Sequence, residues 1–529
     1  MKLGKSLLAG GFCLALAALP LFSGGRNDGS RGAGTNSAGQ VNSDTVTYWV
    51  GFNVQASANY TNLGETPFGK GLMEKTGIKV EFLHPPAGSG DEQFNLLVAS
   101  GDLPDIMERD WLAFPGGPEK AINDGVIIKL NDVFARYAPN ARAYFNANPE
   151  FDKMIKTDSG NYYVFPFIRN DPGLLTTFGL CIRKDWLDEL GLPVPETIDD
   201  WHTVLTAFKD KKKSPAPLTF EYNSWNGDLA IPLAYRAVKG WYVGDDKKAR
   251  FGTIENAYRD WLTTFAAWYK EGLVDPDLPS QQFQQVSAKM TGGISGASCG
   301  PLASRMGTWI NSARATNPGF TLVAVPTPVL KRGDKPFKGN IDNPYKGYGS
   351  AAITTSCKNV ELAARLLDWG YGEEGILYYN FGTEGESYTV INGKPIYTDF
   401  ILKNPNGWSV AQALGAYARS VDIGPFVQKI GYLEQYYSLP EQQEALKILP
   451  VPGALSYVLP PISQTPEESQ EFSRIMNEIN TYVNEMILKF TLGTESLSSW
   501  DNYVSTVKRM GIDRAIELQN AALARYNAR

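Results

Sequence analysis

The chain has 529 residues, which is too many for one hydrophobic core, so two domains or a two-lobed body are expected. Its 50 basic and 56 acidic residues give a formal net charge of −6, and its lysines and arginines do not cluster. This balance argues against nucleic acid or an anionic membrane surface as the partner. Aromatic residues make up 12% of the chain, which suits either core packing or stacking on sugar rings.

The N-terminal 25 residues have the features of a cleaved secretory signal peptide. Two lysines lie among the first five residues, residues 6–22 are apolar, and Ser23-Gly24-Gly25 supplies small residues. Cys13 lies in the middle of the apolar segment rather than just beyond it, so we expect no lipid anchor. Residues 26–44 are rich in Gly, Ser and Asn without periodicity, which predicts a disordered leader.

An alternation of strands and helices is predicted for the first part of the folded chain. The expected strands are 46–50, 78–83 and 105–107, and the expected helices are 68–76 and 92–100. This order predicts a parallel sheet with crossover helices. No later apolar run approaches the roughly 18 residues that a membrane span requires.

The segment 91–111 predicts a helix that ends abruptly and leads into a buried strand. Asp91 is suited to cap the helix, Gly101 to end it in the left-handed conformation, and Pro104 prevents it from restarting. Open α/β sheets hold their ligands beyond the carboxyl ends of the strands. The residues that this strand delivers there are Glu108, Arg109 and Trp111.

Three further helices are predicted from capping and apolar spacing. Thr197 to Asp200 opens one helix, and Thr465 to Glu468 forms a capping box at the start of a long one. Residues 258–272 repeat apolar side chains at helical spacing and predict a core helix.

Three sequence motifs resemble those of the extracellular solute-binding proteins that serve ABC importers of sugars. ASGDLPDI at 99–106 is similar to the helix-to-strand signature of that family. NFGTEGESY at 380–388 resembles a segment of its large lipoprotein-type oligosaccharide receptors, to which the alginate-binding proteins are related. RMGTW at 305–309 resembles the segment whose tryptophan stacks on the sugar in maltose-type receptors. The resemblance extends, in order, over nearly the whole mature chain.

The resemblance implies an α/β fold, the two-lobed type II periplasmic binding-protein fold, with a mainly parallel sheet flanked by helices in each lobe. It assigns residues 45–165 and 348–405 to the first lobe, and residues 166–347 and 406–529 to the second. A ligand that touches both lobes stabilises only the closed state, so affinity is expected to arise from closure.

Sugar recognition needs flat aromatic faces and hydrogen-bonding side chains in a cleft. The aromatic candidates, for which ligand stacking and core packing fit equally well, are Trp111, Trp225 and Trp309. The candidates for bidentate binding of a uronate carboxylate, although arginines are more often solvated or paired within the protein, are Arg109, Arg169 and Arg305. The other candidate ligand-binding residues are Asn59, Glu65, Tyr163, Asn226, Glu384, Glu386 and Tyr388.

Neither metal binding nor catalysis has a clear signature. His84 and His202 are far apart and in no ligand spacing. Buried free thiols are expected ahead of a Cys299–Cys357 disulfide, because an odd number of cysteines remains after cleavage. Where many oligosaccharide-binding relatives insert a calcium loop, residues 209–215 offer one carboxylate among four lysines. We therefore expect no calcium, no other metal and no cofactor.

The expected function is capture of an oligosaccharide, with uronate-containing sugars among the candidates, and its delivery to the permease subunits of an ABC importer. An unanchored receptor fits a periplasm, and the protein is expected to be a monomer that binds no nucleic acid. A secreted carbohydrate-active enzyme is the alternative by class, because carboxylate pairs such as Glu384 with Glu386, or Asp102 with Asp105, could face a sugar. A peptide or other small solute is the alternative ligand.

Overall fold

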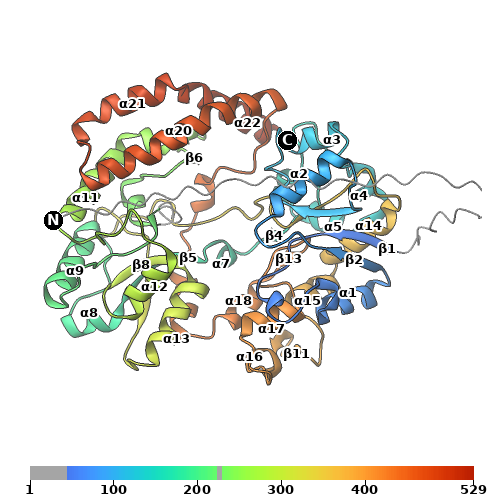
Figure 1. Cartoon of the computed structure of the whole chain (residues 1–529), viewed down its shortest axis with the longest axis horizontal. Coiled ribbons are helices and arrows are strands. Elements are labelled where there is room, and N and C mark those ends of the chain that lie inside the picture. The colour runs from blue at the N-terminus through green and yellow to red at the C-terminus, as the bar shows by residue number, and fades with distance from the viewer. Residues whose placement is uncertain (1–44, 223–228) are drawn as a thin grey trace, which may run out of the picture. The chain divides into compact units, whose positions relative to one another are not determined.

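The computed structural model describes residues 45–222 and 229–529. The predicted signal peptide at 1–25 and leader at 26–44 lie outside the described residues, as do Trp225 and Asn226. Within the described part, thirteen strands form two larger sheets and three two-stranded ones (Figure 1). No helix there has the length and apolar character needed to cross a lipid bilayer.

The first large sheet has the strand order β10-β3-β1-β2. Its strands are β1 (Thr45–Trp49), β2 (Lys79–Leu83), β3 (Ile106–Arg109) and β10 (Ser350–Ile353). β1 runs parallel to β2 and β3, and helices α1 (Pro67–Thr76) and α2 (Gly90–Ser100) connect these strands, which confirms the predicted parallel arrangement. β10 joins from a much later part of the chain and pairs antiparallel with β3.

The helix and strand on either side of Gly101 occur with small shifts from the prediction. α2 begins at Gly90, so Asp91 lies in its first turn instead of capping it, where its charge still favours the helix dipole. The helix ends at Gly101 in the left-handed conformation, with φ at 73°. β3 extends to Arg109, two residues beyond the predicted end, because its last residues pair with β10.

The second large sheet corrects one part of the prediction, because all of its strand pairs are antiparallel. Its strands are β5 (Phe178–Arg183), β8 (Ala297–Pro301) and β9 (Leu322–Val325). β8 continues through a π-helical turn (Leu302–Gly307) and α13 (Thr308–Arg314) into β9, so β8 and β9 run in the same direction. β8, α13 and β9 therefore form a crossover unit, and β5 lies between its two strands in the opposite direction. This arrangement differs from the mainly parallel sheet that was expected.

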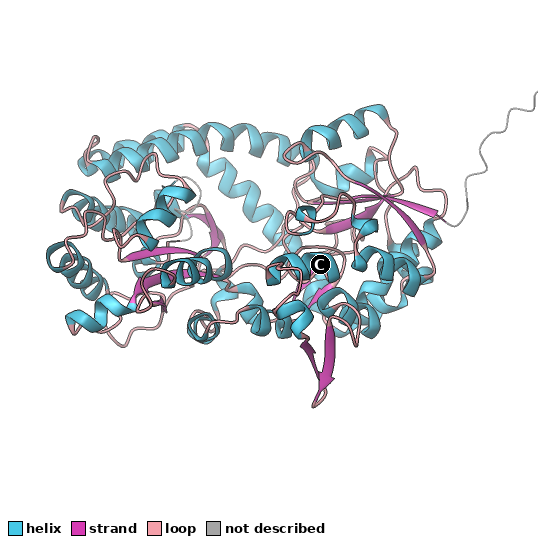
Figure 2. Cartoon of the chain, turned by 60° about the horizontal axis from the view of Figure 1, so that its bottom comes forward, coloured by secondary structure: helices cyan, strands magenta, loops and turns pink. Residues whose placement is uncertain are grey.

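Each large sheet has its own hydrophobic core, and we call the first sheet with its packed residues lobe 1 and the second lobe 2. The lobe 1 core includes Tyr48, Phe94 and Trp111. Two clusters serve lobe 2, one around Trp201 and one around Trp309. Figure 2 shows both sheets among helices, with the hairpin of β11 (Tyr388–Ile391) and β12 (Lys394–Tyr397) projecting from them. The predicted α/β class, with two lobes, is confirmed.

The remaining elements complete the layers around the sheets. Short strand pairs are formed by β4 (Ile168–Arg169) with β13 (Val427–Gln428) and by β6 (Trp241–Val243) with β7 (Ala249–Phe251). The helices up to residue 211 are α3 (Gly117–Asn123), α4 (Asn131–Tyr137), α5 (Pro139–Ala147), α6 (Pro149–Met154), α7 (Pro172–Leu175), α8 (Lys184–Leu190) and α9 (Ile198–Lys211). Those that follow are α11 (Asn256–Lys270), α12 (Phe283–Thr291), α14 (Val360–Asp368), α15 (Glu373–Phe381), α16 (Asp399–Leu402), α17 (Val410–Tyr417), α18 (Ile430–Tyr436), α19 (Pro440–Ile448), α20 (Pro466–Leu492), α21 (Trp500–Arg509) and α22 (Ile512–Ala528).

The helices predicted from capping signals are all present. Thr197 with Asp200 and Thr465 with Glu468 form reciprocal capping boxes at the starts of α9 and α20. α11 buries the predicted aromatic face.

The lobe boundaries inferred from the resemblance stay a prediction. Three contacts between helices bear on them. α17, which follows residue 405, packs against α1 of lobe 1, whereas α20 packs against both α11 and α3.

Candidate functional site

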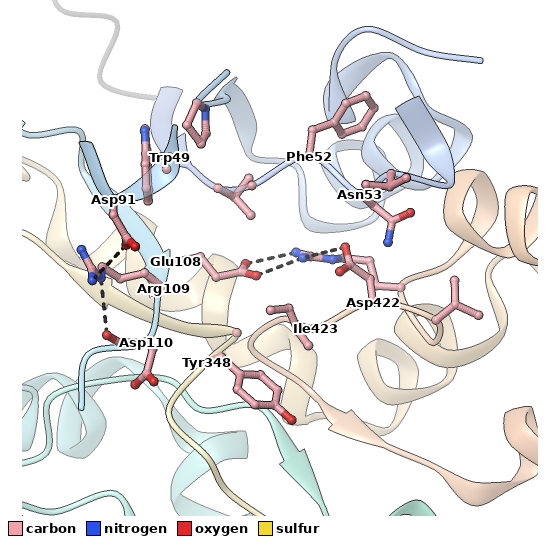
Figure 3. Close-up of a pocket in the computed structure, with 18 of the residues that line it drawn as sticks. Trp49, Phe52, Asn53, Asp91, Glu108, Arg109, Asp110, Tyr348, Asp422 and Ile423 are labelled. Carbon is pink, nitrogen blue, oxygen red and sulfur yellow. Dashed lines mark hydrogen bonds and ion pairs between the residues drawn. The ribbon is translucent and has the colours of Figure 1, made fainter. Parts of the chain in front are cut away.

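A cavity of about 730 Å³ opens at the carboxyl edge of the parallel strands of lobe 1. Most of its lining comes from five segments: residues 49–55 at and beyond the end of β1, the start of α2, the end of β3, and the later segments 348–349 and 419–423 (Figure 3). The strands that pair in the sheet thus bring together side chains from distant parts of the chain. This position is the one at which open α/β sheets bind ligands.

A buried ion pair, Glu108 with Arg419, forms one wall of the cavity. Glu108 is 5% exposed and Arg419 is 4% exposed. The guanidinium donates two hydrogen bonds to the carboxylate, from Nη1 to Oε2 at 3.1 Å and from Nη2 to Oε1 at 3.0 Å. Asp422 accepts a third from Nη2 at 3.3 Å, and Figure 3 shows Glu108 and Asp422 in the cavity wall. The tyrosine hydroxyl of Tyr48 donates to Glu108 at 2.7 Å.

The electrostatics of this wall follow from its burial. Burial raises the pKa of Glu108, although Arg419 and Tyr48 act in the other direction. Burial also works to lower the pKa of Arg419, but the charges of Glu108 and Asp422 outweigh it and the net shift is upward. Both groups are therefore held as a charged pair whose members depend on each other.

Arg109 also lines the cavity. Its guanidinium lies 3.5 Å from the ring centroid of Phe94 and 3.7 Å from the exposed carboxylate of Asp91. Its Nε donates to the Asp110 carbonyl at 3.4 Å, whereas its buried Nη1 has no hydrogen-bond partner. Burial lowers the pKa of this arginine. A buried donor without a partner is costly, so a ligand oxygen that accepts from it would be stabilised.

Aromatic and short polar side chains complete the lining. Trp49, Phe52 and Tyr348 supply rings, and Phe52 also stacks on His84 with 4.9 Å between ring centroids. The indole Nε1 of Trp49 is buried without a hydrogen-bond partner. Asp110 caps the turn beyond β3, where its Oδ1 accepts from the Leu112 amide at 3.0 Å, and burial raises its pKa. Rings beside hydrogen-bonding groups are the chemistry that a sugar requires.

Comparison with known proteins places the chain in a family. The family model for bacterial extracellular solute-binding proteins matches residues 54–376, more than half of the chain. The chain belongs to this family.

Relatives and solved structures of other solute-binding proteins extend the match. The fructooligosaccharide ABC transporter substrate-binding protein FusA of Streptococcus pneumoniae is 23% identical over 487 residues, which is 86% of each chain. The crystal structure of the alginate-binding protein AlgQ2 without calcium ion has a TM-score of 0.70 at 26% identity, covering 91% of this chain and 98% of the other. The structure of FusA in complex with kestose has a TM-score of 0.70 at 19% identity, covering 92% and 99%. The two-lobed binding-protein fold predicted for the chain is thereby shown.

The solute-binding protein buries two of the predicted stacking tryptophans. Trp111 is fully buried, its Nε1 donates to the Met107 carbonyl at 3.1 Å, and its ring packs on Phe94 and Phe114. Trp309 is 1% exposed, and its Nε1 donates to Ser287 Oγ at 2.9 Å. Neither ring offers a face to a ligand in this structure, so both positions favour the core-packing alternative.

Of the three predicted arginines, only Arg109 lines the cavity. Arg169 donates to Asp342 Oδ2 at 3.0 Å and to the Asn343 carbonyl at 2.7 Å. Arg305 is 3% exposed and forms an ion pair with Glu221 in lobe 2. Pairing within the protein, the alternative considered for each arginine, therefore describes Arg169 and Arg305.

The other predicted binding residues lie apart from the cavity lining. Tyr163 and Tyr388 are buried, and the hydroxyl of Tyr163 lies 3.0 Å from that of Tyr345. Asn59, Glu65, Glu384 and Glu386 are exposed. Glu65 accepts from the Thr61 hydroxyl at 2.8 Å, which lowers its pKa. Their roles in binding stay predictions.

Several residues of the cavity were missed by sequence reasoning. Trp49 lies at the carboxyl end of the first strand and Phe52 just beyond it, so the rule that selected Arg109 could have found them. Tyr348, Arg419 and Asp422 had no local signal, because their place beside β3 depends on pairing across the chain.

Metal-ligand geometry was also searched among the residues that the structure describes. No group of three His, Cys, Asp or Glu side chains there is placed to hold a metal ion. In the segment 209–215, Lys212 Nζ donates to Glu189 at 2.5 Å, and Lys209 Nζ donates to the Glu271 carbonyl at 2.5 Å. Cys357 carries a free thiol, so the Cys299–Cys357 disulfide is not formed.

Proposed function

We propose that this protein is the receptor of an ABC importer, that it captures an oligosaccharide in the lobe 1 cavity, and that it delivers the sugar to the membrane permease. The observation that carries the proposal is the cavity at the carboxyl edge of β1, β2 and β3 in a chain of the solute-binding family. Its rings and partnerless buried donors match the two faces of a sugar.

The names of the relatives support an oligosaccharide as the ligand. FusA is a fructooligosaccharide-binding protein and has been solved with kestose, and AlgQ2 is an alginate-binding protein. A cavity of about 730 Å³ falls in the size range of small-molecule sites, which is roughly 300–1,000 Å³.

Closure of lobe 2 over the cavity is part of the proposal. A ligand that touches both lobes stabilises only the closed state, so binding couples to compaction. We expect the receptor to act as a monomer that binds sugar without cleaving it, and the permease to recognise the closed form.

The proposed location is the periplasm, without a lipid anchor. Residues 1–25 suit a cleaved signal, and Cys13 lies inside its apolar segment. The relative LipO of Bacillus subtilis is named a lipoprotein, so the anchor is a clear point of test. Mass spectrometry of the mature N-terminus should find no acyl group, and a diacylglyceryl-cysteine there would refute this part of the proposal.

The test is a thermal-shift screen of neutral and acidic oligosaccharides, followed by calorimetry and small-angle scattering. A ligand should raise the melting temperature by mass action and reduce the radius of gyration. Phe52→Ala should weaken binding about tenfold through loss of a ring face, whereas the exposed Leu96→Ala in the same lobe should not. If no sugar binds, the function is wrong, and new reducing ends would favour an enzyme.

A further inference from the structure

The charged residues of the cavity are unequal in number. Four carboxylates line it, from Asp91, Glu108, Asp110 and Asp422, against two guanidinium groups, from Arg109 and Arg419. The formal charge of the lining is therefore −2. We propose that this charge makes the site select neutral oligosaccharides and reject those with uronate carboxylates, an inference that rests on the proposed function.

Both terminal nitrogens of Arg419 donate to carboxylates of the protein, and its buried Nε is the one donor atom without a hydrogen-bond partner among the described residues. Arg419 donates to Glu108 at 3.0 and 3.1 Å and to Asp422 at 3.3 Å. A uronate that displaced Glu108 would leave that buried carboxylate without its cationic partner, which is unfavourable. The guanidinium therefore has no pair of free terminal donors for an acidic ligand.

Arg109 has a buried donor to offer but faces acidic neighbours. Its Nη1 is partnerless, its Nη2 lies 3.7 Å from the Asp91 carboxylate, and its Nε donates to the Asp110 carbonyl. A hydrogen bond from Nη1 suits a hydroxyl or ring oxygen, whereas bidentate capture of a ligand carboxylate by Nη1 and Nη2 would compete with the ion pair to Asp91. The carboxylates of Asp91 and Asp110 would repel the negative charge of a uronate.

The lysine nearest to the site does not reverse this balance. Lys346 lies close enough to Asp110 to lower its pKa, yet it pairs with Asp342 at 2.9 Å and does not line the cavity. The other two arginines once considered for uronates, Arg169 and Arg305, are paired outside the lining. Neutral sugars gain from the same carboxylates, because sugar hydroxyls can donate to them.

Matched probes that differ only in charge test the selection. Calorimetry with the full mature chain would compare trigalacturonate and trimannuronate with their methyl esters, and would include kestose as a neutral sugar of another class. In 20 mM salt each acid should bind at least tenfold more weakly than its methyl ester. An acid that shows no measurable binding, while a neutral sugar binds under the same conditions, would agree with the inference as well. Raising the salt to 0.5 M should reduce the difference in affinity between acid and ester, because screening weakens the repulsion between the acid and the lining.

Two double variants assign the effect to the lining. Asp91→Asn with Asp110→Asn removes the formal charge of −2, and an asparagine oxygen can still accept the backbone hydrogen bond that Asp110 accepts. Glu81→Gln with Glu92→Gln makes the same charge change at exposed positions of lobe 1 outside the lining. The first pair should reduce the preference for the esters several-fold, and the second should leave it unchanged.

The outcomes separate this inference from the proposed function. An acid that binds as tightly as its ester, or an acid as the tightest ligand of the set, overturns the charge selection and leaves the receptor function standing. An equal loss of preference in both double variants also overturns it, because a distant charge would then act as well. Failure of every sugar, neutral and acidic, refutes the receptor function itself.

Discussion

Each lobe contains a buried arginine–glutamate pair, but the two pairs have different surroundings. Glu108 and Arg419 of lobe 1 line the cavity and are supported by Tyr48 and Asp422. Glu221 and Arg305 of lobe 2 are buried to a similar extent, yet neither lines that cavity. Burial lowers the pKa of Arg305 to about 10, whereas the pKa of Arg419 is raised.

The comparison shows that a buried charge pair does not by itself mark a binding site. The lobe 1 pair joins three distant segments at a sheet edge where a cavity remains, so its loss should affect stability and binding together. The lobe 2 pair lies outside that cavity, so its loss should affect mainly stability. The variants below break or sharpen this contrast.

Removal of the lobe 1 arginine should have the largest effect. Arg419→Met leaves Glu108 buried without its partner, which should lower the free energy of unfolding by about 3–5 kcal/mol and abolish sugar binding. Urea unfolding and calorimetry on the same preparation measure both quantities. Arg305→Met is the matched variant in lobe 2, with a similar loss of stability and a smaller loss of affinity. Equal affinity losses would show that the two pairs serve the ligand alike.

The same variant should respond to pH in a defined direction. Because burial raises the pKa of Glu108, its ionised form costs the native state free energy, and that cost increases when Arg419 is absent. Protonation removes the cost, so the stability gap between Arg419→Met and the natural chain should shrink as the pH falls from 7 to 5. A stability difference that increases over this pH range would contradict the raised pKa assigned to Glu108.

Trp309 tests whether a residue buried in the core of lobe 2 affects stability but not binding. Trp309→Ala should cost about 3–5 kcal/mol of unfolding free energy, because the ring is 1% exposed, while the folded fraction should bind sugar with unchanged affinity. Phe52→Ala in the cavity should give the opposite pattern. If Trp309→Ala instead left stability intact and weakened binding at least tenfold, the stacking role suggested by its sequence would be correct.

The sequence could predict the elements that local signals define. α2 and β3 occur within two residues of their predicted ends, because Gly101 and Pro104 act through their own backbone preferences. Arg109 was found by the rule for sheet edges. Trp111, two residues further on, turns back into the core instead, since Phe94 and Phe114 provide a packed site for its ring.

The partner of Glu108 could not be predicted in the same way. Arg419 lies 311 residues further along the chain, and no spacing in the sequence connects the two. The direction of β5 was missed for a related reason, because its neighbours β8 and β9 arrive more than one helix later. Local sequence signals define the helices and strands, whereas pairing between distant segments determines which of them line the cavity together.

A smaller effect is expected from the hydroxyl that supports Glu108. Tyr48→Phe removes one hydrogen bond to a charged acceptor, which should cost about 1.5 kcal/mol, with Arg419 still in place. Tyr163→Phe in the same core loses only a bond between two neutral hydroxyls and should cost less. Urea unfolding midpoints, compared at equal slope, would rank the stability losses of the two variants. A larger loss for Tyr163→Phe than for Tyr48→Phe would mean that Arg419 alone stabilises the Glu108 carboxylate.

Chelation should have no effect on either lobe. In the segment 209–215 of lobe 2, lysines bond to Glu189 and to the Glu271 carbonyl, and among the described residues no three His, Cys, Asp or Glu side chains are placed to hold a metal ion. Dialysis against EDTA should therefore leave the melting temperature and the sugar affinity unchanged. A lower melting temperature that calcium restores would show that lobe 2 holds a metal after all.

The pairing of β10 with β3 sets an order of events during synthesis. Near this pair, the Thr354 hydroxyl donates to the Pro104 carbonyl across 250 residues of chain. At 5–20 residues per second, a ribosome needs roughly 12 to 50 s to cover that distance, and over this time the edge of β3 has no neighbour on one side. The wall that carries Glu108 therefore cannot close while the chain is still short. A nascent chain would present an unpaired strand edge to chaperones and to the export machinery before it could hold any ligand.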